Sequence, residues 1–383
     1  MANLDELRIE MDKADKDLLA ALQKRMEVAE KIGEFKKGSG KAIYDGQRER
    51  EKMSAIYDMA DDRTKPYISP IYTMLFEASR GLQTKVVSHE DDETKIIRDA
   101  IDEMNSKPFP VRANVACQGV EGAFSQVACE RLFNIPNIMF MRTFAQVFQA
   151  IDAGLCNYGV LPVENSNAGT VSAVYDLMIK NSFKIVRSVR VKVDHNCFMR
   201  KGGKLSDIKE VISHEQAINQ CKEFVKSLGP DVKVTYYSNT AEAAKYVAES
   251  GRNDICCLSS IKCGELYDLD LIKSSVQDSG NNYTRFIVIS KKIEIYPGAN
   301  RTSMMMILKH EPGALYKILA YFYARGVNLV KIESRPLPGR DFEFMFYFDL
   351  ETSIYNEGFA EMMSELKAMT SELRYLGSYN EIV

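Results

Sequence analysis

Apolar side chains recur at steps of three, four and seven along the first 37 residues, as one face of a helix requires. The stripe consists of Leu4, Leu7, Met11, Leu18, Leu22, Met26, Ala29 and Ile32. It predicts one long amphipathic helix over 4–37, which is followed by helices over about 47–59 and about 68–84. Nothing within the chain covers the far half of so long a first helix. We therefore expect an intertwined helical dimer.

Further along the chain the pattern changes to short apolar runs that alternate with helical stretches. Between 111 and 291 this alternation favours an α/β domain with a mainly parallel sheet. Residues 297–383 predict instead strand, helix, strand, strand, helix, strand, which is the ferredoxin-like α+β order βαββαβ. We therefore expect a multidomain chain with an all-α helical domain over 1–88 and a helical linker over 89–110, before the α/β and α+β domains.

Composition narrows the possible partners. A length of 383 residues suits two or three domains, and a formal net charge of -3 gives no field to attract nucleic acid or an acidic membrane. The eight cysteines and four histidines show no metal-ligand spacing, so we expect no metal and reduced, mostly buried thiols. No stretch is apolar enough to span a membrane, and the N-terminus is charged from Asp5 onward. We expect a cytoplasmic protein.

Several polar residues of the helical region fall on common faces. Arg25 and Lys36 are eleven residues apart, which leaves them about 20° from alignment and roughly 16 Å apart along the helix. Arg8 lies about 100° from that face, so it is better placed to reach a partner subunit's pocket. Helical spacing also groups Asp45, Arg48 and Glu49, and it pairs Ser79 with Gln83. Each of these alone is better explained as a solvated side chain of a helical bundle.

Taken together, these residues resemble the all-helical AroQ class of chorismate mutases throughout residues 1–85. The resemblance implies that Arg25, Arg48 and the partner subunit's Arg8 hold the two carboxylates of chorismate. It implies that Lys36 and Gln83 address the ether oxygen, and that the hydroxyl group is held by Asp45, Glu49 and Ser79. A pericyclic rearrangement needs no nucleophile or general base, so cations and an amide donor suffice.

In the α/β region, two polar clusters are attached to apolar strands, which is where α/β folds place their ligands. They are Pro-Val-Glu-Asn-Ser-Asn-Ala-Gly-Thr at 162–170 and Asn-Asn-Tyr-Thr-Arg-Phe at 281–286. Other polar blocks lie at the glycine-rich turn 118–125, at 213–221 and at 238–240. Individually these blocks fit a tight turn, a capped turn and ordinary helix starts.

In this order the blocks resemble prephenate dehydratases from 116 to 290, a family with a two-lobed α/β fold. The resemblance implies that Thr284 hydrogen-bonds the leaving hydroxyl group and that Arg285 engages a carboxylate or braces the loop. It implies that the substrate is positioned by Glu164, Asn165 and Gln220. Further substrate contacts are expected from Gly122, Ser125, Ser213, His214 and Thr240. Glu215 stands where many relatives have proline, which argues against a catalytic role for His214.

Two motifs of the α+β unit have no evident use in either reaction. Gly313-Ala314-Leu315 opens its first helix, and Glu333-Ser334-Arg335-Pro336 ends its second strand. By themselves they fit a capped helix and a strand end. They resemble the ACT domain fused to prephenate dehydratases, which implies that phenylalanine binds at a dimer interface as a feedback inhibitor.

The whole chain thus resembles bifunctional chorismate mutase/prephenate dehydratases, which turn chorismate into phenylpyruvate. The resemblance implies no metal, nucleotide or redox cofactor, and a homodimer or higher homo-oligomer. Two alternatives stay open. An arogenate dehydratase would act on the aminated substrate, although a fused mutase supplies prephenate instead. A non-catalytic sensor would use the two-lobed domain to bind a ligand. The intact Thr284-Arg285-Phe286 triplet argues against this alternative.

Overall fold

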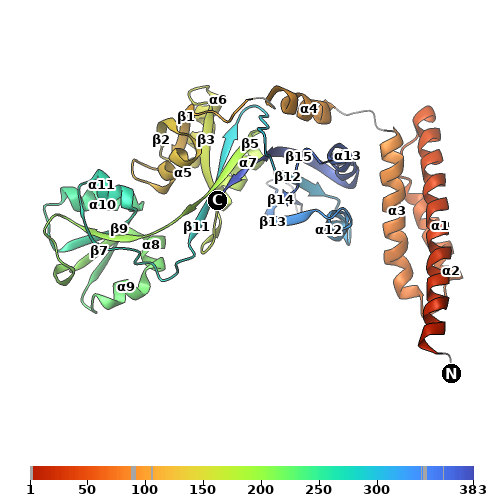
Figure 1. The fold of residues 1–383 in the computed structure, drawn as a ribbon, viewed down its shortest axis with the longest axis horizontal. Coiled ribbons are helices and arrows are strands. Elements are labelled where there is room, and N and C mark those ends of the chain that lie inside the picture. Colours follow the sequence, from red (N-terminus) through yellow and green to blue (C-terminus); the bar gives the residue numbers. More distant parts are fainter. Residues whose placement is uncertain (1–2, 88–91, 105–106, 338, 340–342, 357) are drawn as a thin grey trace. The chain divides into compact units, whose positions relative to one another are not determined.

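Figure 1 shows the computed structural model of the chain, which describes residues 3–87, 92–104, 107–337, 339, 343–356 and 358–383. The chain divides into two compact units. One joins Met1–Arg98 to Met306–Asn328 and Tyr355–Leu373, and the other joins Asp99–Met305 to Leu329–Ile354 and Arg374–Val383. None of the helices in the described part is long and apolar enough to cross a membrane.

Three helices make up the N-terminal region, as predicted: α1 (Leu4–Ser39), α2 (Gly46–Met59) and α3 (Lys65–Val87). α1 ends where Gly40 adopts a left-handed φ of 64°, which a residue without a side chain tolerates best. α3 begins earlier than the predicted start near residue 68. Pro66 fits into its first turn because the N–H groups there have no partner within the helix.

α1 packs against α3 around Ala29 and Gly33, which are both buried. A Cβ atom at Gly33 would lie 3.0 Å from the Cα atom of Gln83. The missing side chain therefore lets the two helices approach closely beside a residue that was predicted to contact the substrate.

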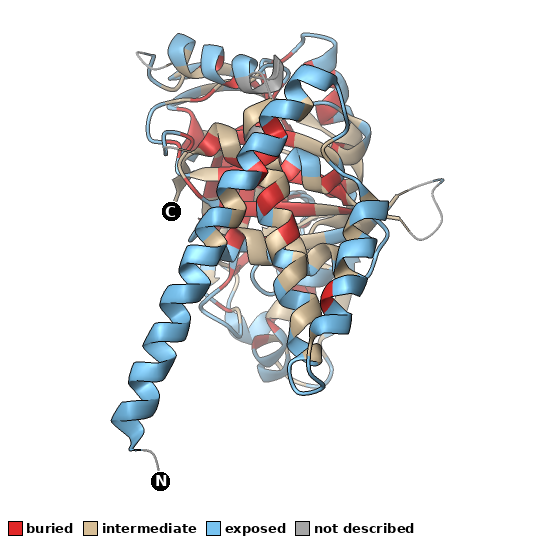
Figure 2. Ribbon diagram, turned by 90° about the vertical axis from the view of Figure 1, so that its right-hand side faces the viewer, coloured by how far each residue is buried: buried red, intermediate tan, exposed pale blue. Residues whose placement is uncertain are grey.

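The N-terminal half of α1 is exposed along its length (Figure 2). Its apolar stripe, formed by Leu4, Leu7, Met11 and Leu18, is between 49% and 66% exposed in the single chain. Burying such side chains against another helix would contribute roughly 1.5–3 kcal/mol for each one. The single chain thus offers the surface that the predicted dimer needs, and dimerisation itself stays a prediction.

Two mixed sheets form the α/β region. The first has the strand order β16-β5-β11-β3-β1-β2, with β4 paired to β3. Its strands are β1 (Arg112–Gln118), β2 (Ile135–Met141), β3 (Tyr158–Asn165), β4 (Gly169–Thr170), β5 (Lys184–Lys192), β11 (Tyr283–Ser290) and β16 (Glu381–Ile382). Its helices are α5 (Phe124–Leu132), α6 (Phe144–Asp152) and α7 (Ser172–Lys180).

The second sheet has the order β10-β6-β9-β7-β8 and forms a second lobe. Its strands are β6 (Asn196–Met199), β7 (Glu210–His214), β8 (Lys233–Tyr237), β9 (Ile255–Ser259) and β10 (Asp270–Lys273). Its helices are α8 (Glu215–Gln220), α9 (Lys222–Ser227), α10 (Thr240–Glu249) and α11 (Ile261–Leu266), with a short 3-10 turn η1 (Leu205–Asp207). Each lobe has its own apolar core, and all eight cysteines are buried and unpaired.

The expectation of a mainly parallel sheet is wrong at the centre of the first sheet. There β11 runs antiparallel to both of its neighbours, β3 and β5. The chain leaves this sheet after β5 to build the second lobe and returns as β11. The outgoing and returning strands lie side by side, so they run in opposite directions.

The C-terminal region contains β12 (Arg301–Leu308), α12 (Ala314–Ala324), β13 (Asn328–Pro336), β14 (Phe344–Glu351), α13 (Phe359–Met369) and β15 (Thr370–Tyr379). Its strand order, β13-β14-β12-β15, is the ferredoxin-like order that the sequence predicted. The last strand, β16, pairs in parallel with β5, so the end of the chain joins the first α/β sheet.

The predicted linker over 89–110 contains one helix, α4 (Asp92–Met104). Two acidic residues of its charged run, Glu90 and Asp91, lie outside the described residues. Near its end, the Phe109 ring packs against Phe133 and Tyr296, with 5.0 Å between ring centroids in each pair. The final residues of the linker are thereby attached to the core of the first sheet.

Candidate active sites

A cavity of about 520 Å³ opens between α1, α2 and α3. Seven of the eight polar residues predicted for this region line it: Arg25, Lys36, Asp45, Arg48, Glu49, Ser79 and Gln83. The eighth, Arg8, lies on the exposed part of α1 and pairs with Asp5 at 3.2 Å. The packing of the three helices thus brings the seven side chains together and leaves Arg8 outside the cavity.

Arg25 is fixed by contacts with α3. Its Nη1 donates to the carbonyl oxygen of Leu75 at 2.7 Å and to the hydroxyl group of Ser79. Burial lowers the pKa of Arg25 from its ordinary value, although a guanidinium group stays charged at neutral pH. A cation that has lost part of its hydration and is held in one orientation is well suited to bind a carboxylate.

Lys36 occupies the other end of the cavity. Its Nζ donates to the carbonyl oxygen of Ile43 at 2.6 Å. Burial lowers the pKa of Lys36, and the negative charges of Asp45 and Glu49 partly oppose that shift. The ammonium group keeps further N–H bonds with which it can contact a ligand.

Gln83 is buried on the α3 side of the cavity, and its Oε1 has no hydrogen-bond partner among the described residues. Buried polar side-chain atoms are normally satisfied, so this oxygen is available to accept a hydrogen bond from a ligand. Arg80 also lines the cavity and pairs with Glu49 and, at 2.5 Å, with Glu77. Our sequence analysis did not single out Arg80, although its position three residues before Gln83 puts it on the same helix face.

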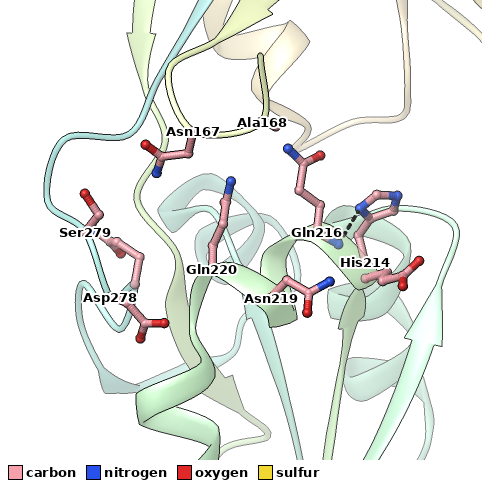
Figure 3. Close-up of a pocket in the computed structure, with 10 residues that line it drawn as sticks. Asn167, Ala168, His214, Gln216, Asn219, Gln220, Asp278 and Ser279 are labelled. Carbon is pink, nitrogen blue, oxygen red and sulfur yellow. Dashed lines mark hydrogen bonds between the residues drawn. The ribbon is translucent and has the colours of Figure 1, made fainter. Parts of the chain in front are cut away.

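A second cavity, of about 570 Å³, lies in the α/β region (Figure 3). Three segments line it: the β3–β4 turn with Asn167 and Ala168, the start and outer face of α8, and residues 277–279. α8 contributes Glu215, Gln216, Asn219 and Gln220, and His214 precedes it as its cap. The lining is rich in amides and contains His214 as its only histidine.

Buried amides connect this cavity to β11. Asn165 Nδ2 donates to the hydroxyl oxygen of Thr284 at 3.0 Å and to Asn282 Oδ1 at 2.8 Å. Asn282 Nδ2 in turn donates to Gln220 Oε1 at 3.0 Å, and His195 Nε2 lies 2.9 Å from the same oxygen. Three of the predicted residues, Asn165, Gln220 and Thr284, therefore belong to one hydrogen-bonded cluster.

The comparisons with known proteins agree for both regions. Residues 7–84 match the family of type II chorismate mutases, and residues 115–294 match the prephenate dehydratase family. A bifunctional chorismate mutase/prephenate dehydratase from Aquifex aeolicus is 30% identical over 385 residues, which is 99% of this chain and 98% of that protein. The chain belongs to this bifunctional family. It converts chorismate to prephenate and prephenate to phenylpyruvate.

Two further comparisons each cover 70% of this chain. The Arabidopsis thaliana arogenate dehydratase/prephenate dehydratase 2 is 36% identical over 280 residues, which is 70% of this chain and 73% of that protein. The crystal structure of a prephenate dehydratase from Arthrobacter aurescens in complex with L-Phe has a TM-score of 0.64 and 27% identity. It covers 70% of this chain and 89% of that one.

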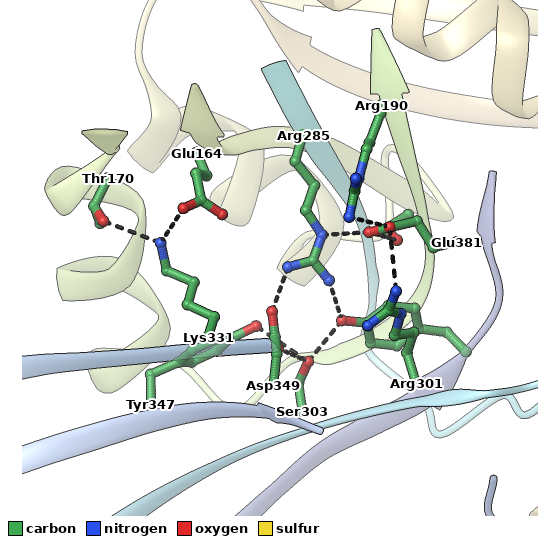
Figure 4. Close-up of polar contacts among 12 residues, drawn as sticks. Glu164, Thr170, Arg190, Arg285, Arg301, Ser303, Lys331, Tyr347, Asp349 and Glu381 are labelled. Carbon is green, nitrogen blue, oxygen red and sulfur yellow. Dashed lines mark hydrogen bonds and ion pairs between the residues drawn. The ribbon is translucent and has the colours of Figure 1, made fainter. Parts of the chain in front are cut away.

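The dehydratase strands separate the predicted residues onto two faces. Thr284 pairs with Asn165 across β11 and β3, and Arg285 pairs with Glu164. Successive residues of a strand point to opposite faces, so Arg285 and Glu164 face away from the amide cluster. Glu164 Oε1 lies 3.0 Å from Nζ of Lys331 (Figure 4). The structure therefore does not bring Glu164 and Arg285 together with Thr284.

Arg285 is buried on that opposite face. It forms ion pairs with Asp349 of β14 and, at 2.7 Å, with Glu381 of β16 (Figure 4). Its Nη2 donates to the hydroxyl group of Tyr379 at 2.8 Å. Burial works against the charge, but Tyr379 and Asp349 more than compensate, and the pKa of Arg285 is raised. The guanidinium group thus joins β11 of the dehydratase sheet to the C-terminal strands.

The glycine-rich turn is occupied by contacts within the protein. The N–H group of Gly122 donates to Gln126 Oε1 at 2.7 Å, and a Cβ atom at Gly122 would lie 2.6 Å from the sulfur of Cys263. Gly122 has a φ of 87°, so this position requires glycine for both its conformation and its space. Gly122 and the buried Ser125 lie outside the lining of the dehydratase cavity.

The other predicted dehydratase residues have local partners. The hydroxyl group of Ser213 donates to the carbonyl oxygen of Leu258 at 2.6 Å. His214 lines the cavity and caps α8, since its Nδ1 accepts from the N–H group of Gln216 at 3.2 Å. Thr240 begins α10 and lies outside the lining. Only His214 of these three faces the cavity.

The two C-terminal motifs have different surroundings. Gly313 caps α12 with a left-handed φ of 81°, and Ala314 and Leu315 follow in the first turn of that helix. On β13, Glu333 Oε2 accepts from the hydroxyl group of Thr170 at 2.8 Å. The guanidinium group of Arg335 donates to both carboxylate oxygens of Asp176 at 2.9 Å. Glu333 and Arg335 therefore contact the dehydratase region, and Ser334 between them is exposed.

Proposed function

We propose that the helical cavity is the chorismate mutase site. Chorismate carries two carboxylates, and the cavity offers Arg25 and Arg48 from one chain, with the partner subunit's Arg8 as the third cation. Lys36 and Gln83 then address the ether oxygen, on which charge develops as the C–O bond breaks. Asp45, Glu49 and Ser79 hold the hydroxyl group and the cations. The convergence of Arg25, Lys36 and the buried amide of Gln83 on one cavity is the observation that supports this proposal most strongly.

The reaction follows from these groups. A pericyclic rearrangement needs a compact substrate conformer and stabilisation of the departing oxygen, which fixed cations supply without proton transfer. Incubation with chorismate, with prephenate and phenylpyruvate followed separately, measures both activities in one experiment. Adding phenylalanine to a parallel reaction shows which of the two steps it inhibits.

The proposed role of Arg8 requires a dimer in which each mutase site takes residues from both chains. We expect Arg8→Ala and Arg25→Ala to be inactive alone and to recover about a quarter of wild-type mutase activity when coexpressed in equal amounts. Half of the dimers are then mixed, and each mixed dimer has one intact site. Chorismate turnover by the copurified proteins measures the recovery.

The control for this experiment coexpresses Arg25→Ala with Lys36→Ala, which both belong to the same half of the site and should not complement. Equal recovery in both mixtures would contradict the shared site. Full activity of Arg8→Ala alone would remove Arg8 from it.

For the second reaction, we propose that prephenate binds in the cavity between the β3–β4 turn, α8 and residues 277–279. Prephenate loses its hydroxyl group and carbon dioxide and becomes aromatic, so the enzyme needs chiefly to assist departure of the hydroxyl group. Thr284 is the proposed donor, with Asn165 and Gln220 as positioning groups. The ion pairs of Arg285 with Asp349 and Glu381 favour its predicted bracing role over contact with a substrate carboxylate.

The name of the Arabidopsis relative includes both arogenate and prephenate as substrates. We propose that this enzyme prefers prephenate to arogenate because its own mutase domain produces prephenate. A comparison of kcat/KM for prephenate and arogenate decides between the two, and a preference for arogenate would overturn the proposal.

We propose that the C-terminal unit is an ACT domain and that phenylalanine inhibits the dehydratase by binding to it. The ferredoxin-like strand order and the Arthrobacter complex with L-Phe support this proposal. The predicted ligand contacts are Gly313, Ala314 and Leu315 on one side and Glu333, Ser334 and Arg335 on the other. A ligand at a subunit interface also favours the assembly that it bridges, so phenylalanine is expected to tighten or enlarge the oligomer.

Gly313→Leu is expected to weaken phenylalanine inhibition and leave uninhibited dehydratase turnover largely intact, because the side chain blocks the approach to the N-terminus of α12. Any side chain at φ 81° is strained, so Gly313→Ala is the matched control with the same backbone strain and little bulk. Phenylalanine titrations of prephenate turnover compare the two variants. Unchanged inhibition of a folded Gly313→Leu protein would move the regulatory site elsewhere.

A further inference from the structure

The amide cluster behind the dehydratase cavity has a defined donor and acceptor order. The backbone N–H groups of Asn167 and Ala168 donate to Asn165 Oδ1 at 3.1 and 2.9 Å. Because that oxygen is used twice as an acceptor, the other end of the Asn165 amide must be the NH2 group. This NH2 group donates to Asn282 Oδ1, to the hydroxyl oxygen of Thr284 and, at 3.2 Å, to the carbonyl oxygen of Tyr283, so all three oxygens are acceptors toward Asn165.

The same order continues to a buried histidine. Asn282 accepts through Oδ1, so its NH2 group is the donor to Gln220 Oε1 at 3.0 Å. His195 Nε2 approaches the same Gln220 oxygen at 2.9 Å and must therefore carry a proton. Its other ring nitrogen, Nδ1, is buried without a partner in the described part of the chain, which suits an unprotonated atom. Burial also lowers the pKa of His195, so the ring is neutral.

Two groups of this arrangement, Gln220 in the cavity lining and Thr284 outside it, keep hydrogens that no neighbour in the cluster accepts. The Gln220 oxygen is occupied by Asn282 and His195, so the NH2 group of Gln220 is left for a ligand. Figure 3 shows Gln220 extending from α8 toward the turn that carries Asn167 and Ala168. Thr284 accepts from Asn165 and keeps its own hydroxyl hydrogen, which it can donate.

We propose that Asn282 and His195 are positioning residues of the dehydratase reaction, which orient Gln220 and Thr284 so that both present donors to the substrate. The inference rests on the proposed role of Thr284 as the donor to the leaving hydroxyl group. Asn282 and His195 are 1% and 3% exposed, whereas Thr284 is half-buried, so Asn282 and His195 act only through their neighbours. Rotating the side-chain amide of Asn165 or of Asn282 by 180° would place one acceptor oxygen against another in a buried site. The hydrogen bonds therefore fix the orientation of both amides.

The test compares two substitutions of His195. His195→Leu removes the donor to Gln220, so kcat for prephenate is expected to fall roughly tenfold or more, with a smaller change in KM. His195→Gln places an amide N–H within reach of the same oxygen and should recover most of that loss. Mutase turnover and the thermal unfolding midpoint report whether each variant is folded. Equal turnover of folded His195→Leu and wild type, or no recovery in His195→Gln, would overturn the proposal.

Asn282→Asp tests the order at the centre of the cluster, because its carboxylate cannot donate to Gln220. The substitution is made in wild type, in Thr284→Val and in Gln220→Leu. If Asn282 acts through Thr284 and Gln220, its effect on kcat is smaller in these two backgrounds than in wild type. Equal effects in all three backgrounds would overturn the proposal. Near-normal turnover of Thr284→Val alone would instead refute the proposed donor, so the two failures are distinguishable.

Discussion

Replacing Lys36 with alanine is expected to lower mutase kcat by at least about a hundredfold, while turnover of added prephenate stays at the wild-type level. Lys36 is the single cation assigned to the ether oxygen, and its ammonium group is fixed against the Ile43 carbonyl oxygen at 2.6 Å. Loss of one preorganised donor to a developing oxyanion costs about 3 kcal/mol or more. Steady-state kinetics with chorismate and with prephenate measure the two activities separately.

Lys37→Ala is the matched control, since Lys37 follows on the same helix, is exposed and lies outside the cavity lining. This variant should retain both activities. If Lys36→Ala turns over chorismate at a rate near that of Lys37→Ala, the ether oxygen must be stabilised by Gln83 or another group.

The mutase site was largely predictable because its geometry is local. Within one helix, spacing fixes which side chains share a face, and this placed Arg25 and Lys36 correctly toward one cavity. The position of α3 against α1 depends on the close contact at Gly33, which sequence spacing does not reveal. Arg80 was missed because an arginine on a helix face is usually a solvated charge, and only the pairing with Glu49 distinguishes it.

For the proposed dehydratase site, the sequence predicted which segments take part better than it predicted how their side chains are arranged. Strand alternation alone implies that Thr284 and Arg285 point to opposite faces, although the shared motif suggested one site for both. Which face meets the C-terminal strands depends on contacts such as Arg285 with Asp349, 64 residues away in the chain. Pairing across such separations is decided by tertiary packing and is not encoded in local spacing.

The same limit applies to Asn282 and His195. Asn282 belongs to the polar segment 281–286, yet its hydrogen-bond partner Asn165 lies 117 residues away in the chain. His195 follows β5 and had no visible motif around it. The role proposed for His195 depends on its contact with Gln220, which only the folded structure shows.

Thr284→Val is expected to lower dehydratase kcat by at least about a hundredfold and to leave mutase activity unchanged. Valine keeps the size and branching of threonine and removes the hydroxyl group, so the variant tests the hydrogen bond with little change in packing. A positioned donor to a leaving group contributes on this scale. Thr284 is held by Asn165 Nδ2 at 3.0 Å, which leaves its hydroxyl hydrogen for the substrate.

Thr284→Ser provides the control, because serine retains the hydroxyl group and should keep most of the dehydratase rate. Prephenate turnover of the two variants, compared at saturating substrate, separates the loss of the donor from the loss of the methyl group. If valine and serine give similar, nearly normal rates, Thr284 is structural. The donor must then be sought at the Gln220 amide, which lines the cavity.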